Sequence, residues 1–400
     1  MTDVAPSPTA AELDAISVQQ LRAAGGVKWT AYPGTIGAFV AEMDFGFPPR
    51  VAEVLEAALR SRSLGYLPPV EHRALQEATV AWVDRTSGWR VPADRVHPVP
   101  DVLTALRETI RRFTAPGSAV IVPTPAYMPF LTVPGAADRE VVQVPSRVDA
   151  DGRYTLDLGA VDAAFAAGAG LLVLCNPWNP VGRVLTREEL LAVADVVERH
   201  GGRVFADEIH APLVLDDVPH VPYASLDART AGHTVTALAA SKGWNVPGLK
   251  CAQMILSGDA DAAAFAPYAA DLATTVGLLG ARAATTVYTD DGGWLAGVVD
   301  YLRGSRDQLE ALVAEHLPGA VLSRLEGTYI AWLDCRGLGL PGPAAAFFRR
   351  EAGVGLTDGN ACGAGGEGFI RMVMATPRPI LRRAVEQMGA AVARLRTTAG

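Results

Sequence analysis

The stretch LLVLCNPWNPVGRVLTREELLAVADVVERHGGRVFAD, residues 171–207, decides the fold. It begins and ends with short apolar runs at 171–175 and 203–207. Continuous runs of this kind are typical of strands that are buried on both faces of a parallel sheet. Between them, Thr186 and Glu189 form a capping-box pattern at the start of an amphipathic helix. A strand, a helix and a second strand in this order predict an α/β domain.

Polar turns follow each of four strand-like runs. Two further runs, 119–123 (AVIVP) and 234–238 (TVTAL), share the apolar character of the first two. The turns after the four runs read TPAY at 124–127, NPWNPVG at 176–182, DEIH at 207–210 and SK at 241–242. Because open parallel sheets bind ligands at the carboxyl ends of their strands, we expect these four turns to form one site.

The C-terminal third has a different pattern. Its helical stretches and strand-like runs are mixed, which predicts a smaller α+β domain. We expect helices at 294–317, 344–352 and 379–396, and strands at 329–334 and 369–374. A chain of 400 residues is also too long for one simple core and is expected to form two or three domains.

Composition excludes several classes of protein. Half of the residues are hydrophobic and 20% are charged, as in a compact globular chain, and the net charge of −8 argues against a nucleic-acid-binding protein. The chain contains no run of 18 apolar residues, so we expect no membrane span. Its first residues lack the pattern of a signal peptide. Four cysteines without metal-ligand spacing predict reduced thiols, no metal site and a cytoplasmic location.

Lysine is rare in this chain. Of the 35 basic residues, only Lys28, Lys242 and Lys250 are lysines. A surviving lysine indicates a position that arginine cannot fill, and one reason is a primary amine that can lose its proton and form a Schiff base. Composition alone leaves chance survival as an equal alternative.

Taken together and in this order, the motifs resemble the pyridoxal-phosphate enzymes of aminotransferase fold type I. The closer match is to the branch of MalY/PatB-like C–S lyases, which includes cystathionine β-lyase. The likeness extends over about residues 28–395 and rests on AEMDF at 41–45, GY at 65–66, PAYMPF at 125–130, LCNPWNPVGR at 174–183, ADEIH at 206–210, SK at 241–242 and GFIR at 368–371.

The resemblance implies a two-domain fold and a dimer. The large domain, expected at 50–287, holds a mostly parallel seven-stranded sheet that is sandwiched by helices. The small α+β domain is built from both termini, 1–49 and 288–400. The expected assembly is a homodimer whose active site is shared across the interface, with no nucleic-acid or membrane partner.

The resemblance also implies roles at the pyridoxal 5′-phosphate ring. Lys242 would hold the cofactor covalently and then move protons as a general base. Asp207 would pair with the pyridine nitrogen and keep it protonated, so that the ring acts as an electron sink. Asn179 would donate to the phenolic oxygen, with His210 beside that oxygen, and Tyr127 would stack on the ring.

The phosphate requires backbone donors at the start of a helix. Val102 and Leu103 open a helical run and would supply these amides. Asp101 would cap this helix rather than repel the phosphate. Ser241 is a further candidate for the phosphate, and Tyr66 resembles the tyrosine that reaches it from the neighbouring subunit.

Arg371 would bind the α-carboxylate of the substrate as a planar fork. Four positions depart from the usual pattern. Ala239 stands where the family often has serine, and Lys250 stands where it often has arginine, so that the cation near the phosphate becomes a point charge. Trp178 stands where this branch commonly has a smaller or polar residue, and Trp244 stands where it commonly has phenylalanine. The two indoles either stack on a bulky S-substituent or only fill space.

The leading interpretation is a C–S β-lyase that converts an S-substituted cysteine or a cystathionine-type thioether into thiol, pyruvate and ammonia. An aminotransferase keeps the same residues and stays an alternative. A biosynthetic tailoring enzyme for a bulky cysteine conjugate, acting by elimination or by decarboxylation-coupled deamination, is a third reading. It is motivated by Trp178, Trp244 and Ala239. A binding or regulatory protein is disfavoured because Lys242, Asp207 and Arg371 are all present.

Overall fold

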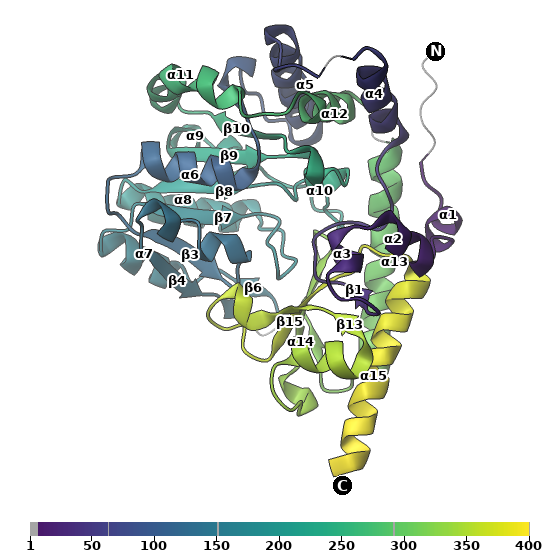
Figure 1. The fold of residues 1–400 in the computed structure, drawn as a ribbon. Coiled ribbons are helices and arrows are strands. Elements are labelled where there is room, and N and C mark those ends of the chain that lie inside the picture. Colours follow the sequence, from purple (N-terminus) through teal and green to yellow (C-terminus); the bar gives the residue numbers. More distant parts are fainter. Residues whose placement is uncertain (1–6, 63, 150–151, 291–292, 400) are drawn as a thin grey trace.

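A computed structural model describes residues 7–62, 64–149, 152–290 and 293–399. Its centre is a sheet of seven strands (Figure 1), in which only β10 runs against its neighbours. The sheet order is β4 (Val141–Pro145), β3 (Val120–Thr124), β7 (Leu171–Cys175), β8 (Arg203–Asp207), β9 (Thr234–Leu238), β10 (Ala252–Leu256) and β2 (Val96–Val99). The predicted mostly parallel seven-stranded sheet is therefore confirmed.

Alternate residues of each central strand point into two separate cores. In β7, Leu172 and Leu174 join one core, while Leu171 and Val173 join the other. The first core contains side chains of α7 (Leu158–Ala166) and α8 (Arg187–Arg199), and the second contains side chains of α6 (Val102–Phe113) and α11 (Asp259–Ala273). Because helices cover both faces, the strands are apolar throughout rather than alternating.

Further helices complete this part of the chain. They are α4 (Pro49–Arg60), α5 (Pro69–Ser87), α9 (Ala228–His233), α10 (Ala240–Gly243) and α12 (Leu278–Thr289). A short hairpin of β5 (Arg147–Val148) and β6 (Tyr154–Thr155) follows β4. The predicted capping box of α8 is present, since Thr186 and Glu189 each accept the other's backbone N–H.

The C-terminal part forms a second, smaller sheet of four strands in the order β11-β12-β15-β14. Its elements are α13 (Gly293–His316), β11 (Val321–Leu322), β12 (Ile330–Asp334), α14 (Ala344–Phe347), β13 (Val354–Gly355), β14 (Thr357–Asp358), β15 (Phe369–Val373) and α15 (Arg378–Ala399). The helix expected at 344–352 is two pieces, because α14 continues as the π-helical turn Phe348–Ala352. The other expected elements of this part are confirmed, and each end differs by at most three residues.

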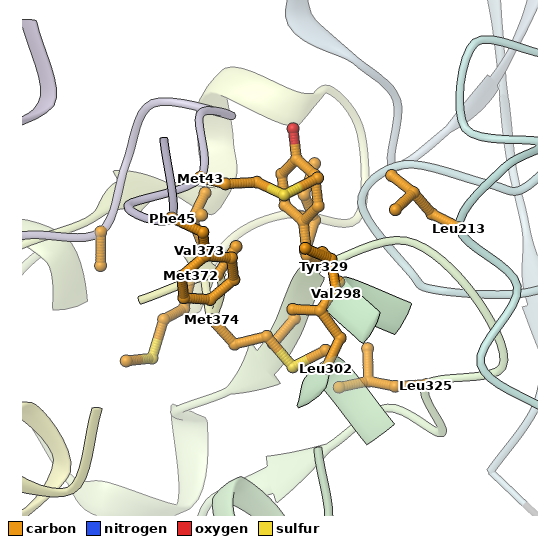
Figure 2. Packing of buried hydrophobic residues seen from close by; sticks show 14 of the residues in the cluster. Met43, Phe45, Leu213, Val298, Leu302, Leu325, Tyr329, Met372, Val373 and Met374 are labelled. Carbon is orange, nitrogen blue, oxygen red and sulfur yellow. The ribbon is translucent and has the colours of Figure 1, made fainter. Parts of the chain in front are cut away.

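The N-terminal residues pack on this smaller part (Figure 1). They form α1 (Ala10–Asp14), α2 (Val18–Ala24), α3 (Val27–Thr30) and β1 (Ile36–Gly37), and β1 pairs in parallel with β13. Figure 2 shows Met43 and Phe45 from the N-terminal segment in one core with Tyr329 and Val298. The boundaries 50–287 and 1–49 plus 288–400 stay a prediction, and residues 1–6, 291–292 and 400 of the small domain lie outside the described residues.

Within the described ranges, no single helix is long and apolar enough to cross a membrane. The helices α11 and α12 meet the length and composition criteria only as a pair, and they are bent by 116° at the break between them.

Candidate active site

A cavity of about 610 Å³ lies at the carboxyl ends of β3, β7, β8 and β9. This volume is within the range of small-molecule and cofactor sites. Four parallel strands end on the same side, so the turn after each one reaches the cavity. The residues that line it are Tyr32, Phe39, Val40, Ala41, Val102, Tyr127, Met128, Cys175, Asn179, Asp207, Ile209, His210, Lys242, Ala345, Ala346, Arg349, Leu356, Thr357, Asp358 and Arg371.

Lys242 projects into this cavity from α10, directly after β9. Its Nζ donates to the backbone oxygen of Ala41 at 2.8 Å, and no carboxylate of the described residues forms an ion pair with it. Burial, together with the positive charge of Arg371, lowers the pKa of Lys242 to about 8. Its amine is therefore far easier to deprotonate than an ordinary lysine amine, as a nucleophilic or basic lysine requires.

Asp207 ends β8 and is almost completely buried, with 2% of its surface exposed. Its Oδ1 accepts the backbone N–H of Ile209 at 3.1 Å, and no other hydrogen bond of its carboxylate is present in the described part of the chain. Burial raises the pKa of Asp207 to about 7. A buried carboxylate that accepts only one hydrogen bond requires a cationic or N–H partner from a ligand to stay ionised.

Arg371 on β15 reaches across to the large sheet. Its guanidinium donates to the backbone oxygen of Phe39 at 2.7 Å, and more weakly to Asn179 Oδ1 and Thr357 Oγ1, each at 3.4 Å. Its Nε is buried without a partner. An arginine that is 3% exposed and pairs with no described carboxylate is available for an anion that enters the cavity.

His210 and Tyr127 complete the wall around Asp207. His210 Nδ1 lies 3.0 Å from Thr328 Oγ1, and burial with the charges of Lys242 and Arg371 lowers the pKa of His210 well below its usual range. The imidazole is therefore neutral and can offer a hydrogen bond without adding charge. Tyr127 lies in the turn after β3, and its ring meets Phe130 edge-on with the centroids 5.3 Å apart.

The first turn of α6 borders the cavity through Val102. Asp101 is the predicted N-cap, because its Oδ1 accepts the N–H of Thr104 at 2.8 Å. Its Oδ2 pairs with Lys250 Nζ at 3.0 Å. Burial opposes the charge on Asp101, but the hydrogen bonds from Lys250 and Thr104 outweigh it and lower the pKa of Asp101. The carboxylate thus faces its own helix and Lys250.

The remaining expected phosphate contacts are less direct. Leu103, Ser241 and Lys250 do not line the cavity, although Ser241 is next to Lys242 and Leu103 is next to Val102. The side chain of Lys250 is 64% exposed, and its backbone is left-handed with φ of 51°. The structure therefore places Leu103 and Lys250 at the start of α6, and Ser241 in α10, rather than on the cavity wall.

Of the two readings of Trp178 and Trp244, the structure favours filling space over contact with the substrate. Both indoles are buried, with 3% and 2% of their surfaces exposed, and neither lines the cavity. Trp178 donates from Nε1 to the backbone oxygen of Pro125 at 3.0 Å, and Trp244 packs against Trp82 and Tyr288. They fill space, and the reason for expecting a bulky S-substituent no longer applies.

Tyr66 is also absent from the cavity wall of its own chain. It precedes α5 and is 88% exposed. An aromatic side chain with this exposure is available to a second molecule.

Sequence reasoning used AEMDF at 41–45 only as part of the family resemblance and gave the segment 41–46 no structural role. Its first residue, Ala41, lines the cavity. Lys28 is buried and its Nζ binds Asp44 at 2.8 Å and the backbone oxygen of Glu42 at 3.2 Å. Asn245 hydrogen-bonds Met43 on both backbone groups and also Gly46. The sequence suggested no role for Lys28. In the structure, Lys28 holds the segment in which the backbone oxygen of Ala41 accepts a hydrogen bond from Lys242. A lysine buried in this way leaves no local sequence signal.

The residues present fit pyridoxal phosphate. Asp207 is a buried carboxylate without a cation, which suits a protonated pyridine nitrogen. Lys242 supplies an amine of lowered pKa in the same cavity. The amides of Val102 and Leu103 start α6 and make no backbone hydrogen bond in the described ranges, as phosphate donors at a helix start require.

Comparisons with known proteins agree with this geometry. The family described as aminotransferase class I and II matches residues 40–388. The chain is 35% identical to the cystathionine beta-lyase of Corynebacterium glutamicum, over 86% of this chain and 91% of that protein. It is 32% identical to the cystathionine beta-lyase PatB of Bacillus subtilis, over 84% and 86%. The structure of cystalysin from Treponema denticola, which contains pyridoxal 5′-phosphate, superposes with a TM-score of 0.87 at 27% identity and covers 95% of this chain and 98% of that one.

Proposed function

Because the chain belongs to the aminotransferase class I and II family, we propose that it is a pyridoxal-phosphate-dependent C–S β-lyase. Its substrate is an S-substituted cysteine or cystathionine-type thioether, and the products are a thiol, pyruvate and ammonia. One observation carries the choice of reaction. The relatives at 30–36% identity are named cystathionine beta-lyase, PatB and MalY, whereas the aspartate aminotransferase of Pyrococcus abyssi is 25% identical.

The chain's own residues hold the reactants. Arg371 binds the α-carboxylate of the amino acid, and its contact with Phe39 fixes the direction of the fork. With pyridoxal phosphate bound, Asp207 would hold the pyridine nitrogen, Asn179 and His210 would serve the phenolic oxygen, and Tyr127 would stack on the ring. When bound, pyridoxal phosphate withdraws electrons from the substrate Cα and so makes its proton acidic.

Lys242 moves the proton. Its pKa of about 8 leaves a useful fraction of neutral amine near neutral pH, so Nζ can accept the proton from Cα. The backbone oxygen of Ala41, 2.8 Å away, orients the amine. The thiolate then leaves from Cβ, and hydrolysis of the remaining three-carbon fragment gives pyruvate and ammonia.

A product assay tests this proposal. The purified enzyme, loaded with cofactor, is incubated with cystathionine and with S-alkyl cysteines, and pyruvate and free thiol are measured. We expect both products in equal amounts. Absence of both for every thioether tried would refute the lyase activity. Formation of a new amino acid only when a 2-oxo acid is added would identify an aminotransferase instead.

We also propose a homodimer in which Tyr66 reaches the phosphate of the neighbouring subunit. Support comes from the corner between α4 and α5, where three apolar side chains are exposed together with Tyr66. Leu59 is 59% exposed, Leu64 is 59% exposed and Val70 is 73% exposed. Apolar side chains gathered in this way are typical of a contact surface.

A cytoplasmic location is proposed as well. All four cysteines are free thiols, and three of them are buried. Free thiols are typical of proteins in a reducing compartment. Localisation of a tagged chain in its host would test this.

A further inference from the structure

Two charged residues that line the cavity have no role in the proposed reaction. Asp207, Lys242 and Arg371 account for the cofactor and for one α-carboxylate. Arg349 and Asp358 line the same cavity and stay unassigned. They carry opposite charges, yet no ion pair joins them.

Arg349 has an uncommitted guanidinium. It lies in the π-helical turn after α14, and its guanidinium carbon is 4.7 Å from the ring centre of Tyr32. No hydrogen bond or ion pair of this guanidinium is present among the described residues, whereas the next residue, Arg350, pairs with Glu351 at 2.6 Å. The aromatic ring orients the arginine and leaves its N–H donors free.

The surroundings leave space beside Arg349. Ala345 and Ala346, which precede it on α14, also line the cavity, and their small side chains do not fill it. The ring of Tyr32 lies 4.9 Å from that of Phe39, whose backbone oxygen holds Arg371 at 2.7 Å. One N-terminal segment therefore supports two arginine forks that face one cavity. A simple amino acid has only one carboxylate and needs only one of them.

Asp358 supplies the opposite charge. It ends β14, where the preceding residue, Thr357, contacts Arg371. Its Oδ1 accepts from the backbone and the side chain of Asn360, at 3.0 and 2.9 Å, and its Oδ2 has no partner in the described part of the chain. One carboxylate oxygen thus remains available to a cation in the cavity.

We propose that Arg349 and Asp358 bind the end of the substrate that is remote from the scissile C–S bond, and that this end is itself an amino acid. Arg349 pairs with its carboxylate and Asp358 with its ammonium group. This inference rests on the proposed lyase function and narrows it to thioethers with a zwitterionic amino acid at both ends. Simple S-alkyl cysteines then become poorer substrates, because they leave both charges unpaired.

Four thioethers separate the two contacts. Cystathionine carries both distal charges, S-(2-carboxyethyl)cysteine carries only the carboxylate, S-(2-aminoethyl)cysteine carries only the ammonium, and S-ethylcysteine carries neither. We expect Arg349→Gln to lower kcat/KM about 10-fold or more for the two carboxylate-bearing substrates, mainly through KM. The same variant should leave the other two within about twofold.

Asp358→Asn is the complementary variant. Asparagine keeps the oxygen that accepts from Asn360, so the local turn is preserved. We expect kcat/KM to fall about 10-fold or more for cystathionine and S-(2-aminoethyl)cysteine only. Arg350→Gln is the matched control, because Arg350 is adjacent in sequence and does not line the cavity; it should change none of the four values.

Binding gives a second readout that does not depend on turnover. In a Lys242→Ala background, calorimetry measures the dissociation constant of cystathionine with and without Arg349→Gln, and about a 10-fold weakening is expected. Equal effects of Arg349→Gln on all four thioethers, or an unchanged dissociation constant, would overturn the inference. Pyruvate from S-ethylcysteine in the Arg349→Gln, Asp358→Asn and Arg350→Gln enzymes would meanwhile show that the lyase activity stands on its own.

Discussion

The three lysines of this arginine-rich chain occupy three different environments. Lys28 is buried in an ion pair, Lys242 faces the cavity, and Lys250 is exposed beside Asp101. Only Lys242 combines burial with a cavity and lacks a carboxylate partner. Its chemistry is therefore set by its surroundings, and the other two lysines act as fixed charges.

Replacement of Lys242 tests its amine. We expect Lys242→Ala to lose the visible absorbance of bound cofactor and to lower turnover about 10³-fold or more. Lys242→Arg should fail equally, because a guanidinium stays protonated. Lys250→Arg, which keeps a cation beside Asp101, should retain both the absorbance band and turnover. Survival of the band in Lys242→Ala would contradict the assignment.

Asp207 makes the stability of the cofactor-free enzyme depend on pH. Its pKa in the folded chain, about 7, lies above the ordinary value of 3.8, so its ionisation opposes folding. This cost is absent below about pH 4, grows as the pH rises to 7, and is constant above that. We expect Asp207→Asn to raise the free energy of unfolding of the apoenzyme at pH 8, by up to about 4 kcal/mol.

Urea unfolding of the two apoenzymes at pH 4.5 and pH 8 measures this effect. The gain from Asp207→Asn should fall to about 1 kcal/mol at pH 4.5, where the folded wild type holds Asp207 protonated and only the unfolded chain is mostly ionised. A gain of equal size at both pH values would show that burial of the charge is not its cause. With pyridoxal phosphate bound, the gain at pH 8 should shrink, because the carboxylate then has its partner.

At the scale of elements, the segment 41–46 depends on one buried ion pair. Lys28 and Asp44 have side chains that are 1% and 4% exposed, and Trp29 Nε1 also donates to Asp44 at 2.8 Å. Removal of one partner leaves the other charge buried without compensation. The pair therefore ties α3 to the segment whose residue Ala41 accepts a hydrogen bond from Lys242.

We expect Lys28→Met to lower the free energy of unfolding by about 3 kcal/mol or more. Lys250→Met is the matched control. It removes a lysine that is 64% exposed, and it should cost less than about 1 kcal/mol. Chemical denaturation of both variants gives the comparison. Equal losses of unfolding free energy in the two variants would mean that the buried pair of Lys28 and Asp44 stabilises the fold no more than the exposed pair of Lys250 and Asp101.

Elements with local signals could be predicted well. The capping box of α8 and the N-cap Asp101 of α6 are both present, because a cap is decided within four residues of chain. The expected strand at 119–123 lies one residue later, at Val120–Thr124. The split of 344–352 into α14 and a π-helical turn could not be predicted, since packing rather than propensity decides it.

At the scale of the whole molecule, the active site is built where two sheets meet. The seven-stranded sheet supplies Asp207 and Lys242, and the four-stranded sheet supplies Arg371. Gly182, at the end of the NPWNPVG turn, shows why the contact is close. Its φ is +79°, and a Cβ there would lie 2.6 Å from Leu325 of the smaller part. A side chain at this position would have a strained backbone and would have to displace the side chain of Leu325.

The exposed corner between α4 and α5 predicts a dimer. We expect Val70→Glu to shift the chain toward monomers and to lower cofactor affinity, because a charge is costly in an apolar contact and Tyr66 is then lost from the neighbouring site. Light scattering after size exclusion measures the assembly. Val321→Glu, at an exposed valine elsewhere on the molecule, is the control and should stay dimeric. A monomeric wild type would refute the dimer.

By itself, the sequence determined the α/β fold and the set of turns around the cavity. Apolar runs followed by polar turns are local patterns, and parallel strands must end at one edge. Five residues at or after these strand ends accordingly line the cavity: Lys242, Asp207, Asn179, Tyr127 and His210. Arg371, which the family resemblance implied, lines it from the smaller sheet.

Only the tertiary structure decided what surrounds these residues. It buried Trp178 and Trp244 in the core, gave Lys28 its place under the segment 41–46, and brought Arg349 and Asp358 to the same cavity. These outcomes depend on contacts between residues far apart in the chain. The direction of a side chain at such contacts follows from packing, which no local pattern contains.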